Sequence, residues 1–356
     1  MKLLVSAPGK LHLLGEHVVV HNKPAIITAV DKRCFVQIDF RKDEKIKIVS
    51  KNYKQEITIT FLEIVNKFQK AEKAYQKYSK TNNIELLKSI TKDPLDYPLL
   101  IVGQFINSNG LKSISGFDLT IDSKIPVGAG MGSSGALAVS IIGALYLFIN
   151  KKFDKETINK IAYLCEQKKH GKPSGGDNTT SCFGGLVWFK KDEGLKSLVF
   201  VLPKDVTQNF YVVNTGTPKE TTGEMVSMVK DLLQKNPKVI QDIFDDQAIL
   251  VNNLLNSLKN GENDQIIEII RAGEGNLEKL GVVSLFVQKI IRDIEASGGA
   301  AKICGGGGIK KGTGMLLIYH KDLKKLQKAL KNYKLIPTQL TLGVEGLKIE
   351  NISDTI

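Results

Sequence analysis

A glycine-rich loop that runs directly into an apolar segment constrains this chain more than any other feature. The stretch "PVGAGMGSSGALAVSIIGALYLFI", residues 126–149, has glycines at 128, 130 and 132, followed by Ser133 and Ser134. Glycines let consecutive backbone N–H groups converge without a Cβ in the way, and a following helix adds its positive dipole end. The stretch predicts an anion-binding loop ahead of a buried helix. A tight turn packed against that helix is the alternative.

The loop departs from two familiar phosphate-binding patterns. It lacks the Gly-Lys-Ser/Thr ending of the P-loop, and its spacing and paired serines differ from those of the dinucleotide fingerprint. A hydroxyl of Ser133 or Ser134, on the first helical turn, suits a Mg²⁺ ion that bridges phosphates. The loop therefore favours a nucleotide-phosphate site of another kind.

An acidic pair follows in "CEQKKHGKPSGGDN", residues 165–178. Glu166 shares a helix face with Ile158 and Ala162, on a helix expected to begin after an N-cap at Asp154. Burying an unpaired carboxylate is costly, so a metal ion or a cation is its expected partner. Asp177 lies in a glycine-framed turn, where a helix N-cap is an equally good interpretation.

The segment "GKLHLLGEH" supplies a cation and two of three nearby histidines. Beside a carboxylate, Lys10 would keep that carboxylate ionised and could stabilise negative charge on a transferring phosphoryl group. His12, His17 and His21 are spaced by five and four residues, which puts them on no common strand face, and no cysteine accompanies them. This pattern disfavours a zinc site.

Length and composition indicate a two-lobed globular protein. The 356 residues are 42% hydrophobic and 24% charged, and no apolar run reaches the length of a membrane span. We therefore expect a cytoplasmic protein with no membrane contact. A change of pattern near Pro203 predicts lobes at residues 1–203 and 204–356. The four scattered cysteines predict free thiols.

The net charge of +13 raises the possibility of a nucleic-acid-binding protein. Only four of the 50 basic residues are arginines, and aromatic residues do not alternate with the basic ones as in base-reading surfaces. A solvated lysine-rich surface is the preferred interpretation, and we expect no nucleic-acid partner.

Hydrophobic periodicity predicts a mixed α+β chain. We expect a short strand, a turn at Pro8–Gly9 and a second strand that continues through Val18–Val20, then strands near 34–40 and 45–50. Residues 61–92 look like an exposed, lysine-rich helical insertion. Several amphipathic helices follow Pro203, and a pair of strands is expected to end the chain.

Three segments carry a family resemblance. "APGKLHLLGEHVVVHNKPAI", "PVGAGMGSSGALAVS" and "HGKPSGGDNTTSCFGG" resemble, in order and spacing, the motifs of the GHMP kinase superfamily, most closely its mevalonate kinase branch. "NTGTPKETTGEMV" is also similar to that branch, and the likeness extends to about Gly314. The third glycine loop, "CGGGGIKKGTG", is interrupted by residues 309–311, so its conformation and its effect on specificity stay open. Its two lysines could meet an anionic group of substrate or product.

The resemblance implies the fold and the reaction. The fold would have an N-terminal lobe like the second domain of ribosomal protein S5 and a ferredoxin-like C-terminal lobe. The activity would be ATP- and Mg²⁺-dependent phosphorylation of mevalonate to 5-phosphomevalonate, by a homodimer. A phosphomevalonate, mevalonate 3-position or sugar kinase is the alternative within the superfamily, and an inactive ATP-binding relative is a third.

The resemblance also implies roles for individual residues. Asp177 would accept or orient the proton of the substrate hydroxyl, and Lys10 would pair with Asp177 and the transferring phosphoryl group. Ser134 and Glu166 would hold Mg²⁺. The nucleotide phosphates would lie on Pro126, Gly128, Gly130, Met131, Gly132, Ser133, Ser134 and Gly135. The hydroxy acid would lie on Glu16, His17, Lys219 and Thr221.

Overall fold

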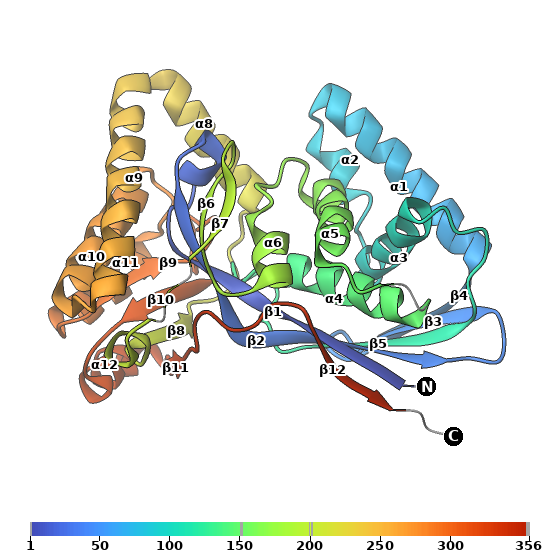
Figure 1. Cartoon of the computed structure of the whole chain (residues 1–356). Helices are drawn as coiled ribbons and strands as arrows, with labels where there is room; N and C mark the ends of the chain where they lie inside the picture. The colour runs from blue at the N-terminus through green and yellow to red at the C-terminus, as the bar shows by residue number, and fades with distance from the viewer. Residues whose placement is uncertain (1, 150–151, 199, 201, 354–356) are drawn as a thin grey trace.

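The computed structural model describes residues 2–149, 152–198, 200 and 202–353, and has two β-sheets, each covered by helices (Figure 1). The expected α+β class is confirmed. The larger sheet lies mainly in the N-terminal half of the chain and the smaller one in the C-terminal half. The lobe boundary near Pro203 stays a proposal, since the last strand of the chain joins the first sheet.

The larger sheet has strand order β12-β1-β2-β5-β3-β4, with β6 paired to β2 and β7 paired to β6. The pairs are antiparallel except β3 with β5, which run parallel. The strands are β1 (Lys2–Leu14), β2 (Ala25–Phe40), β3 (Lys45–Ser50), β4 (Gln55–Thr60), β5 (Phe117–Ser123), β6 (Leu186–Lys190), β7 (Gly194–Ser197) and β12 (Lys348–Ser353).

The helices of the N-terminal half of the chain lie on one side of this sheet (Figure 1). They are α1 (Phe61–Thr81), α2 (Ile84–Lys88), α3 (Asp96–Ser108), α4 (Ser133–Phe148), α5 (Lys155–His170) and α6 (Gly176–Phe183). Helix α4 packs on β1 and β2 and between α3, α5 and α6, so the buried helix expected after the glycine loop is confirmed. The N-cap at Asp154 is also confirmed, because its carboxylate accepts from the N–H of Glu156 and of Thr157.

The C-terminal sheet is antiparallel with order β11-β8-β10-β9, in line with the ferredoxin-like lobe. Its strands are β8 (Phe210–Asn214), β9 (Ala300–Ile303), β10 (Met315–Tyr319) and β11 (Thr338–Gln339). The surrounding helices are α7 (Lys204–Thr207), α8 (Thr222–Lys235), α9 (Pro237–Asn260), α10 (Asn263–Lys279), α11 (Leu285–Ala296) and α12 (Leu323–Leu330).

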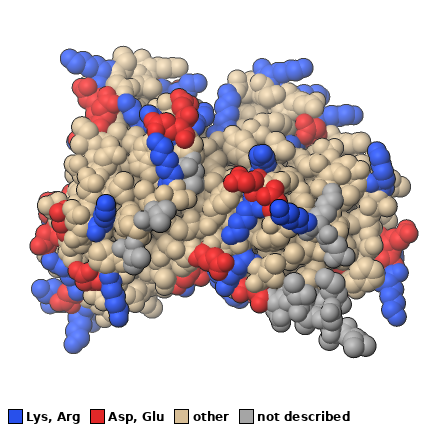
Figure 2. Space-filling view, in the orientation of Figure 1, with Lys and Arg blue, Asp and Glu red and all other residues tan. Residues whose placement is uncertain are grey.

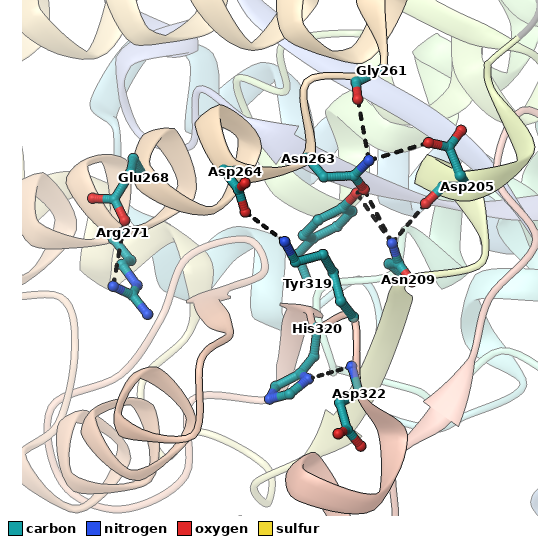
Figure 3. Close-up of polar contacts among 11 residues, drawn as sticks. Asp205, Asn209, Gly261, Asn263, Asp264, Glu268, Arg271, Tyr319, His320 and Asp322 are labelled. Atoms are coloured by element: carbon teal, nitrogen blue, oxygen red, sulfur yellow. Dashed lines mark hydrogen bonds and ion pairs between the residues drawn. The ribbon is translucent and has the colours of Figure 1, made fainter.

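A polar network joins α7, the start of α10 and the end of β10 (Figure 3). The Asn263 amide donates to the Asp205 carboxylate at 3.2 Å, and its oxygen accepts from Asn209 at 3.1 Å and from the Tyr319 hydroxyl. A groove of about 770 Å³ lies beside it along α9 and α10, and its lining includes none of the motif residues. The network thus connects α7, α10 and β10 at a place separate from the motif residues.

Two expectations about the first strand are wrong. Strand β1 runs without a turn through Pro8 and Gly9, where a register shift against β2 accommodates them. The valines at 18–20 belong to a 3₁₀ turn, Val18–His21, because Gly15 and His17 take positive φ and end the extended path. The two strands expected near the end of the chain are present, and they join different sheets: β11 pairs with β8, and β12 pairs with β1.

The lysine-rich segment 61–92 is only partly the exposed insertion that was expected. Its helix α1 begins with a capping box at Thr60 and Glu63, and it buries Ile64, Phe68 and Tyr78 on one face. That face packs on α3, where a Cβ on Gly103 would lie 2.6 Å from the Phe68 Cβ. The helix is part of the lobe, and only its outer face is lysine-rich.

Charges of both signs mix on the surface. Figure 2 shows Lys and Arg side chains scattered over both lobes of this face, with Asp and Glu side chains among them. In the described part of the chain, no helix combines the length and hydropathy that a membrane span requires.

We expect the substitution Phe105→Ala to destabilise the N-terminal lobe. Phe105 is fully buried in α3 and makes an edge-to-face contact with Tyr146 at 5.1 Å between ring centroids. Loss of its side chain leaves a cavity that should lower the free energy of unfolding by about 3–5 kcal/mol. The urea midpoint, followed by fluorescence of the single tryptophan Trp188 in β6, measures this. Leu62→Ala, at an exposed position of α1, should leave the midpoint unchanged, and an equal shift in both variants would contradict the assignment.

Candidate active site

Lys10 of β1 contacts two of the motif segments. Its backbone N–H donates to the carbonyl of Met131 at 3.0 Å, which fixes the glycine loop to the strand. Its ammonium lies 2.8 Å from the Asp177 carboxylate, and the Lys10 side chain is 4% exposed against 34% for Asp177. The structure thus brings together the predicted cation, the predicted base and the loop.

Glycines are required where these segments touch. A Cβ on Gly132, at φ 66°, would lie 2.8 Å from the Lys10 Cγ, and one on Gly135 would lie 3.0 Å from the backbone nitrogen of Asn178. The first distance is shorter than real Cβ contacts and the second is at their lower limit, so a side chain at either position would crowd the neighbouring strand or α6. Close packing with Lys10 and α6 therefore explains these two glycines.

The third glycine loop packs directly on the first. A Cβ on Gly130, at φ 82°, would lie only 2.3 Å from the carbonyl oxygen of Cys304. The N–H of Met315 donates to the carbonyl of Ala129 at 3.1 Å. The C-terminal lobe thus packs against the first glycine loop through backbone contacts, despite the interruption by residues 309–311.

The start of α4 offers backbone donors. Gly132 is the N-cap in the left-handed conformation, and no side chain caps the helix. The first N–H groups of a helix have no intrahelical acceptors, so they can bind an anion together with the dipole end. Within the predicted loop, Met131 is buried and Gly128 is exposed, whereas Pro126 and Ser133 are half-buried.

The two predicted metal ligands lie side by side. The Ser134 hydroxyl is 3.0 Å from Glu166 Oε2, and Glu166 is buried at 2% exposure. The Tyr97 hydroxyl donates to the other carboxylate oxygen at 2.5 Å, and His170 Nε2 lies 3.2 Å from the Ser134 hydroxyl. Mg²⁺ takes oxygen ligands, typically one or two carboxylates plus phosphates and water, so this pair fits it. Among the described residues, no cluster of three or more His, Cys, Asp or Glu side chains could hold a metal.

Asp177 is not a helix N-cap. Helix α6 begins at Gly176 with Gly175 as its cap, and Asp177 lies in the first turn with its carboxylate on Lys10. The N-cap interpretation, which the sequence left open, is therefore wrong. The aspartate is held by a cation and remains one-third exposed.

His12 completes the Lys10 environment and was missed as a site residue. Lys10 Nζ lies 3.1 Å from His12 Nδ1, and because an ammonium can only donate, Nδ1 must accept. Burial, and then the nearby Lys10 ammonium, lowers the pKa of His12 well below its usual value, so the ring is neutral. The sequence contained one indication of this role: His12 follows Lys10 by two residues, so in a strand both side chains lie on the same face.

Glu16 and His17 lie where the two lobes meet. Glu16 is 1% exposed and pairs with Lys302 of β9, while its second oxygen Oε2 has no protein partner. His17, at φ 61°, donates from Nε2 to the carbonyl of Gly306 at 3.0 Å. Burial lowers the pKa of His17 to about 4, so it is neutral at physiological pH.

The structure places the two predicted substrate residues of the C-terminal lobe, Lys219 and Thr221, near the third glycine loop. Lys219 is exposed. The Thr221 hydroxyl accepts from the N–H of Glu224 in a capping box at the start of α8. Their segment does adjoin the third glycine loop, because a Cβ on Gly306 would lie 3.1 Å from the Thr222 Cα.

We expect Gly130→Ala to impair catalysis by separating the two glycine loops. The added Cβ would meet the Cys304 carbonyl and would strain a backbone at φ 82°. Gly281→Ala is the matched control, because Gly281 has a similar φ of 73° but open space around its Cβ position. Steady-state kinetics should show at least about a tenfold lower kcat/KM for Gly130→Ala than for the control. Equal losses in both would assign the effect to backbone strain alone.

Comparisons with known proteins identify relatives of this chain. The family model described as GHMP kinases N terminal domain matches residues 97–185. The "Mevalonate kinase" of Pyrococcus furiosus is 30% identical over 360 residues, covering 99% of both chains.

Solved structures show the same fold. The mevalonate kinase of Methanococcus jannaschii has a TM-score of 0.77 at 22% identity and covers 96% of this chain and 98% of its own. The galactokinase of Lactococcus lactis, complexed with galactose, has a TM-score of 0.75 at 16% identity, covering 98% of this chain and 95% of its own. The fold is thus common to kinases with different acceptors, and the acceptor has to be argued from the sequence relatives. Because the chain is 30% identical to the Pyrococcus furiosus mevalonate kinase over 99% of its length, it belongs to the mevalonate kinase family of GHMP kinases.

Proposed function

We propose that this enzyme transfers the γ-phosphoryl group of ATP to the 5-hydroxyl of mevalonate. The observation that carries the proposal is the ion pair between Lys10 and Asp177, formed directly beside the glycine loop at the start of α4. The family membership supports the choice of acceptor. Phosphoryl transfer needs positioning and charge stabilisation more than covalent chemistry, and this site offers both.

Asp177 and Lys10 divide the work at the acceptor hydroxyl. The Asp177 carboxylate is partly exposed and can accept or orient the hydroxyl proton. The Lys10 ammonium, held by Asp177 and by His12 Nδ1, is a fixed positive charge beside the loop. Such a charge stabilises the negative charge that develops on the transferring group.

The loop residues and α4 would bind the nucleotide phosphates. The free N–H groups at the start of α4 and the glycine backbone from Gly128 to Gly132 suit phosphate oxygens. Ser134 and Glu166 would hold Mg²⁺, which neutralises phosphate charge when bound. Tyr97 keeps the Glu166 carboxylate oriented, since it already donates to the oxygen that does not face Ser134.

Glu16 and His17 would bind the hydroxy acid. The unpartnered Glu16 Oε2 can accept a hydrogen bond from a substrate hydroxyl. His17 Nδ1 is also buried without a partner, and it is an acceptor because Nε2 carries the proton. Lys219 adds a positive charge near the third loop that suits the substrate carboxylate.

A coupled ADP-release assay tests the proposed acceptor. The panel is mevalonate, phosphomevalonate, galactose and homoserine, each with ATP and Mg²⁺. We expect turnover with mevalonate alone, and product analysis by ³¹P NMR should show phosphate on the primary hydroxyl. Turnover only with a sugar, with homoserine or with phosphomevalonate would replace mevalonate by that acceptor.

We expect Asp177→Asn to lower kcat by about 10²–10⁴-fold, because the amide cannot accept the hydroxyl proton. ATP should still bind, since the loop and α4 are unchanged, and isothermal titration with a non-hydrolysable analogue measures this. Asp242→Asn, at an exposed position of α9, is the control for loss of one negative charge. A kcat for Asp177→Asn close to that of the control would exclude the role given to Asp177.

The two lysines in the third loop are expected to contribute to anion binding. Lys310 and Lys311 are exposed beside the segment that carries Lys219. Their joint replacement by alanine should raise the KM for ATP or mevalonate about two- to fivefold, as for loss of an exposed charge contact. Lys324→Ala/Lys325→Ala on α12 removes the same charge elsewhere and should leave both constants unchanged. If the KM values for ATP and mevalonate are unchanged in both double variants, Lys310 and Lys311 do not contribute to anion binding.

Assembly and location remain proposals. The family resemblance favours a homodimer in the cytoplasm, and light scattering of the purified chain measures the oligomeric state.

A further inference from the structure

Lys302 is a fully buried cation at the junction of the two lobes. It lies in β9, directly before the third glycine loop, and its exposed fraction is 0%. Its ammonium donates to Glu16 Oε1, to the carbonyl of His12 at 3.2 Å and to the carbonyl of Ile303 at 2.7 Å. An ammonium has three protons, so all its donors are used within the protein.

Stability alone does not account for such a pair. Desolvating two charges is costly, and a well-packed apolar pair of similar volume is often as stable or more so. A buried ion pair is better suited to fixing one arrangement of the chain. If the two charged residues moved apart, each charge would stay buried without the opposite charge. The question is therefore which arrangement Lys302 fixes.

Lys302 holds the turn that follows β1. Two of its acceptors, Glu16 Oε1 and the His12 carbonyl, belong to the N-terminal lobe, whereas Lys302 itself belongs to the C-terminal sheet. The backbone between and after them takes positive φ, at 106° for Gly15, which glycine adopts readily, and at 61° for His17. A non-glycine residue in this region persists only where its surroundings hold it.

His17 receives a second contact from the same part of the C-terminal lobe. Its Nε2 donates to the carbonyl of Gly306, four residues after Lys302, at 3.0 Å. Lys302 thus holds Glu16, and Gly306 holds His17. These two contacts come from the two ends of the short segment 302–306. Neither contact involves the ATP loop residues 128–132.

We propose that Lys302 is a positioning residue for the acceptor: through Glu16 it holds the turn that carries His17, and so it sets the affinity for the hydroxy acid rather than for ATP. The proposal rests on the proposed function of Glu16 and His17. In this proposal Lys302 does not contact the substrate. Loss of Lys302 should therefore change the KM for mevalonate without changing the KM for ATP.

The first test replaces the charge with an apolar side chain of similar length. For Lys302→Met we expect the KM for mevalonate to rise about tenfold or more, as when a reacting group loses its position, with the KM for ATP within about twofold. Lys168→Met is the matched control: Lys168 is 4% exposed and its ammonium pairs with Glu72 at 3.0 Å and Gln104 at 2.8 Å, within the helices of the N-terminal lobe. An unchanged KM for mevalonate, or a parallel rise in both constants, overturns the proposal.

A second measurement needs no turnover. The chain has five histidines, so the imidazole ¹⁵N signals can be assigned by substitution. In the wild type without substrate, His17 should show a proton on Nε2 and stay neutral down to about pH 4. In Lys302→Met its signals should shift and titrate nearer the ordinary range, while Lys168→Met should leave them unchanged. Unchanged His17 signals in Lys302→Met overturn the proposal, whichever acceptor the enzyme uses.

A double variant covers the case in which Lys302→Met does not fold because Glu16 is left unpaired. Lys302→Met/Glu16→Gln removes the lone buried charge and should restore the fold but not the wild-type His17 signals. Wild-type signals in that folded double variant overturn the proposal. Absence of mevalonate turnover in the wild type would instead reject the proposed function and leave the spectroscopic result to decide the role of Lys302.

Discussion

The architecture of the site depends on one residue, Lys10, and on how closely the chain packs around it. Its backbone N–H holds the glycine loop, its ammonium holds Asp177, and its methylene groups fill the space in which Gly132 lacks a side chain. Strand β1 is the common support, and it is paired with β2 on one side and with β12 on the other. The glycine loop, Asp177 and the Lys10 ammonium are therefore positioned by a rigid element.

A second set of buried polar groups continues along the same strand. His12 accepts from Lys10 through its side chain and from Lys302 through its carbonyl, and Glu16 follows with its own bond to Lys302. These buried groups extend from the proposed phosphoryl-transfer position to the proposed acceptor position, and the last of them, Lys302, belongs to the C-terminal lobe. The third glycine loop meets both ends, through Cys304 on Gly130 and through Gly306 on His17.

Local sequence patterns predicted much of this arrangement. The Ser133–Phe148 helix is recognisable because a long apolar run directly follows a glycine cap, and the α5 boundaries because Asp154 and Gly171 lie at its two ends. The valines at 18–20 misled, since β-branched residues favour strands but positive φ at Gly15 and His17 ends the strand first. In α1 the many lysines hid the helical spacing of Ile64, Phe68 and Tyr78.

Contacts between distant segments were beyond such patterns. Lys302 looks like an ordinary lysine ahead of a glycine loop, and its partner Glu16 lies 286 positions away. His12 was considered only as a metal ligand, because its relation to Lys10 depends on burial that the sequence does not display. The motifs predicted which residues gather at the site. The buried contacts that hold those residues required the three-dimensional structure.

A double-mutant cycle on Lys10 and Asp177 tests the central claim most directly. If the two residues act as one unit, kcat/KM of Lys10→Met/Asp177→Asn should be close to that of the more impaired single variant, because each substitution already destroys the pair. Losses that multiply in the double variant would mean that the two residues act independently, and would contradict the account.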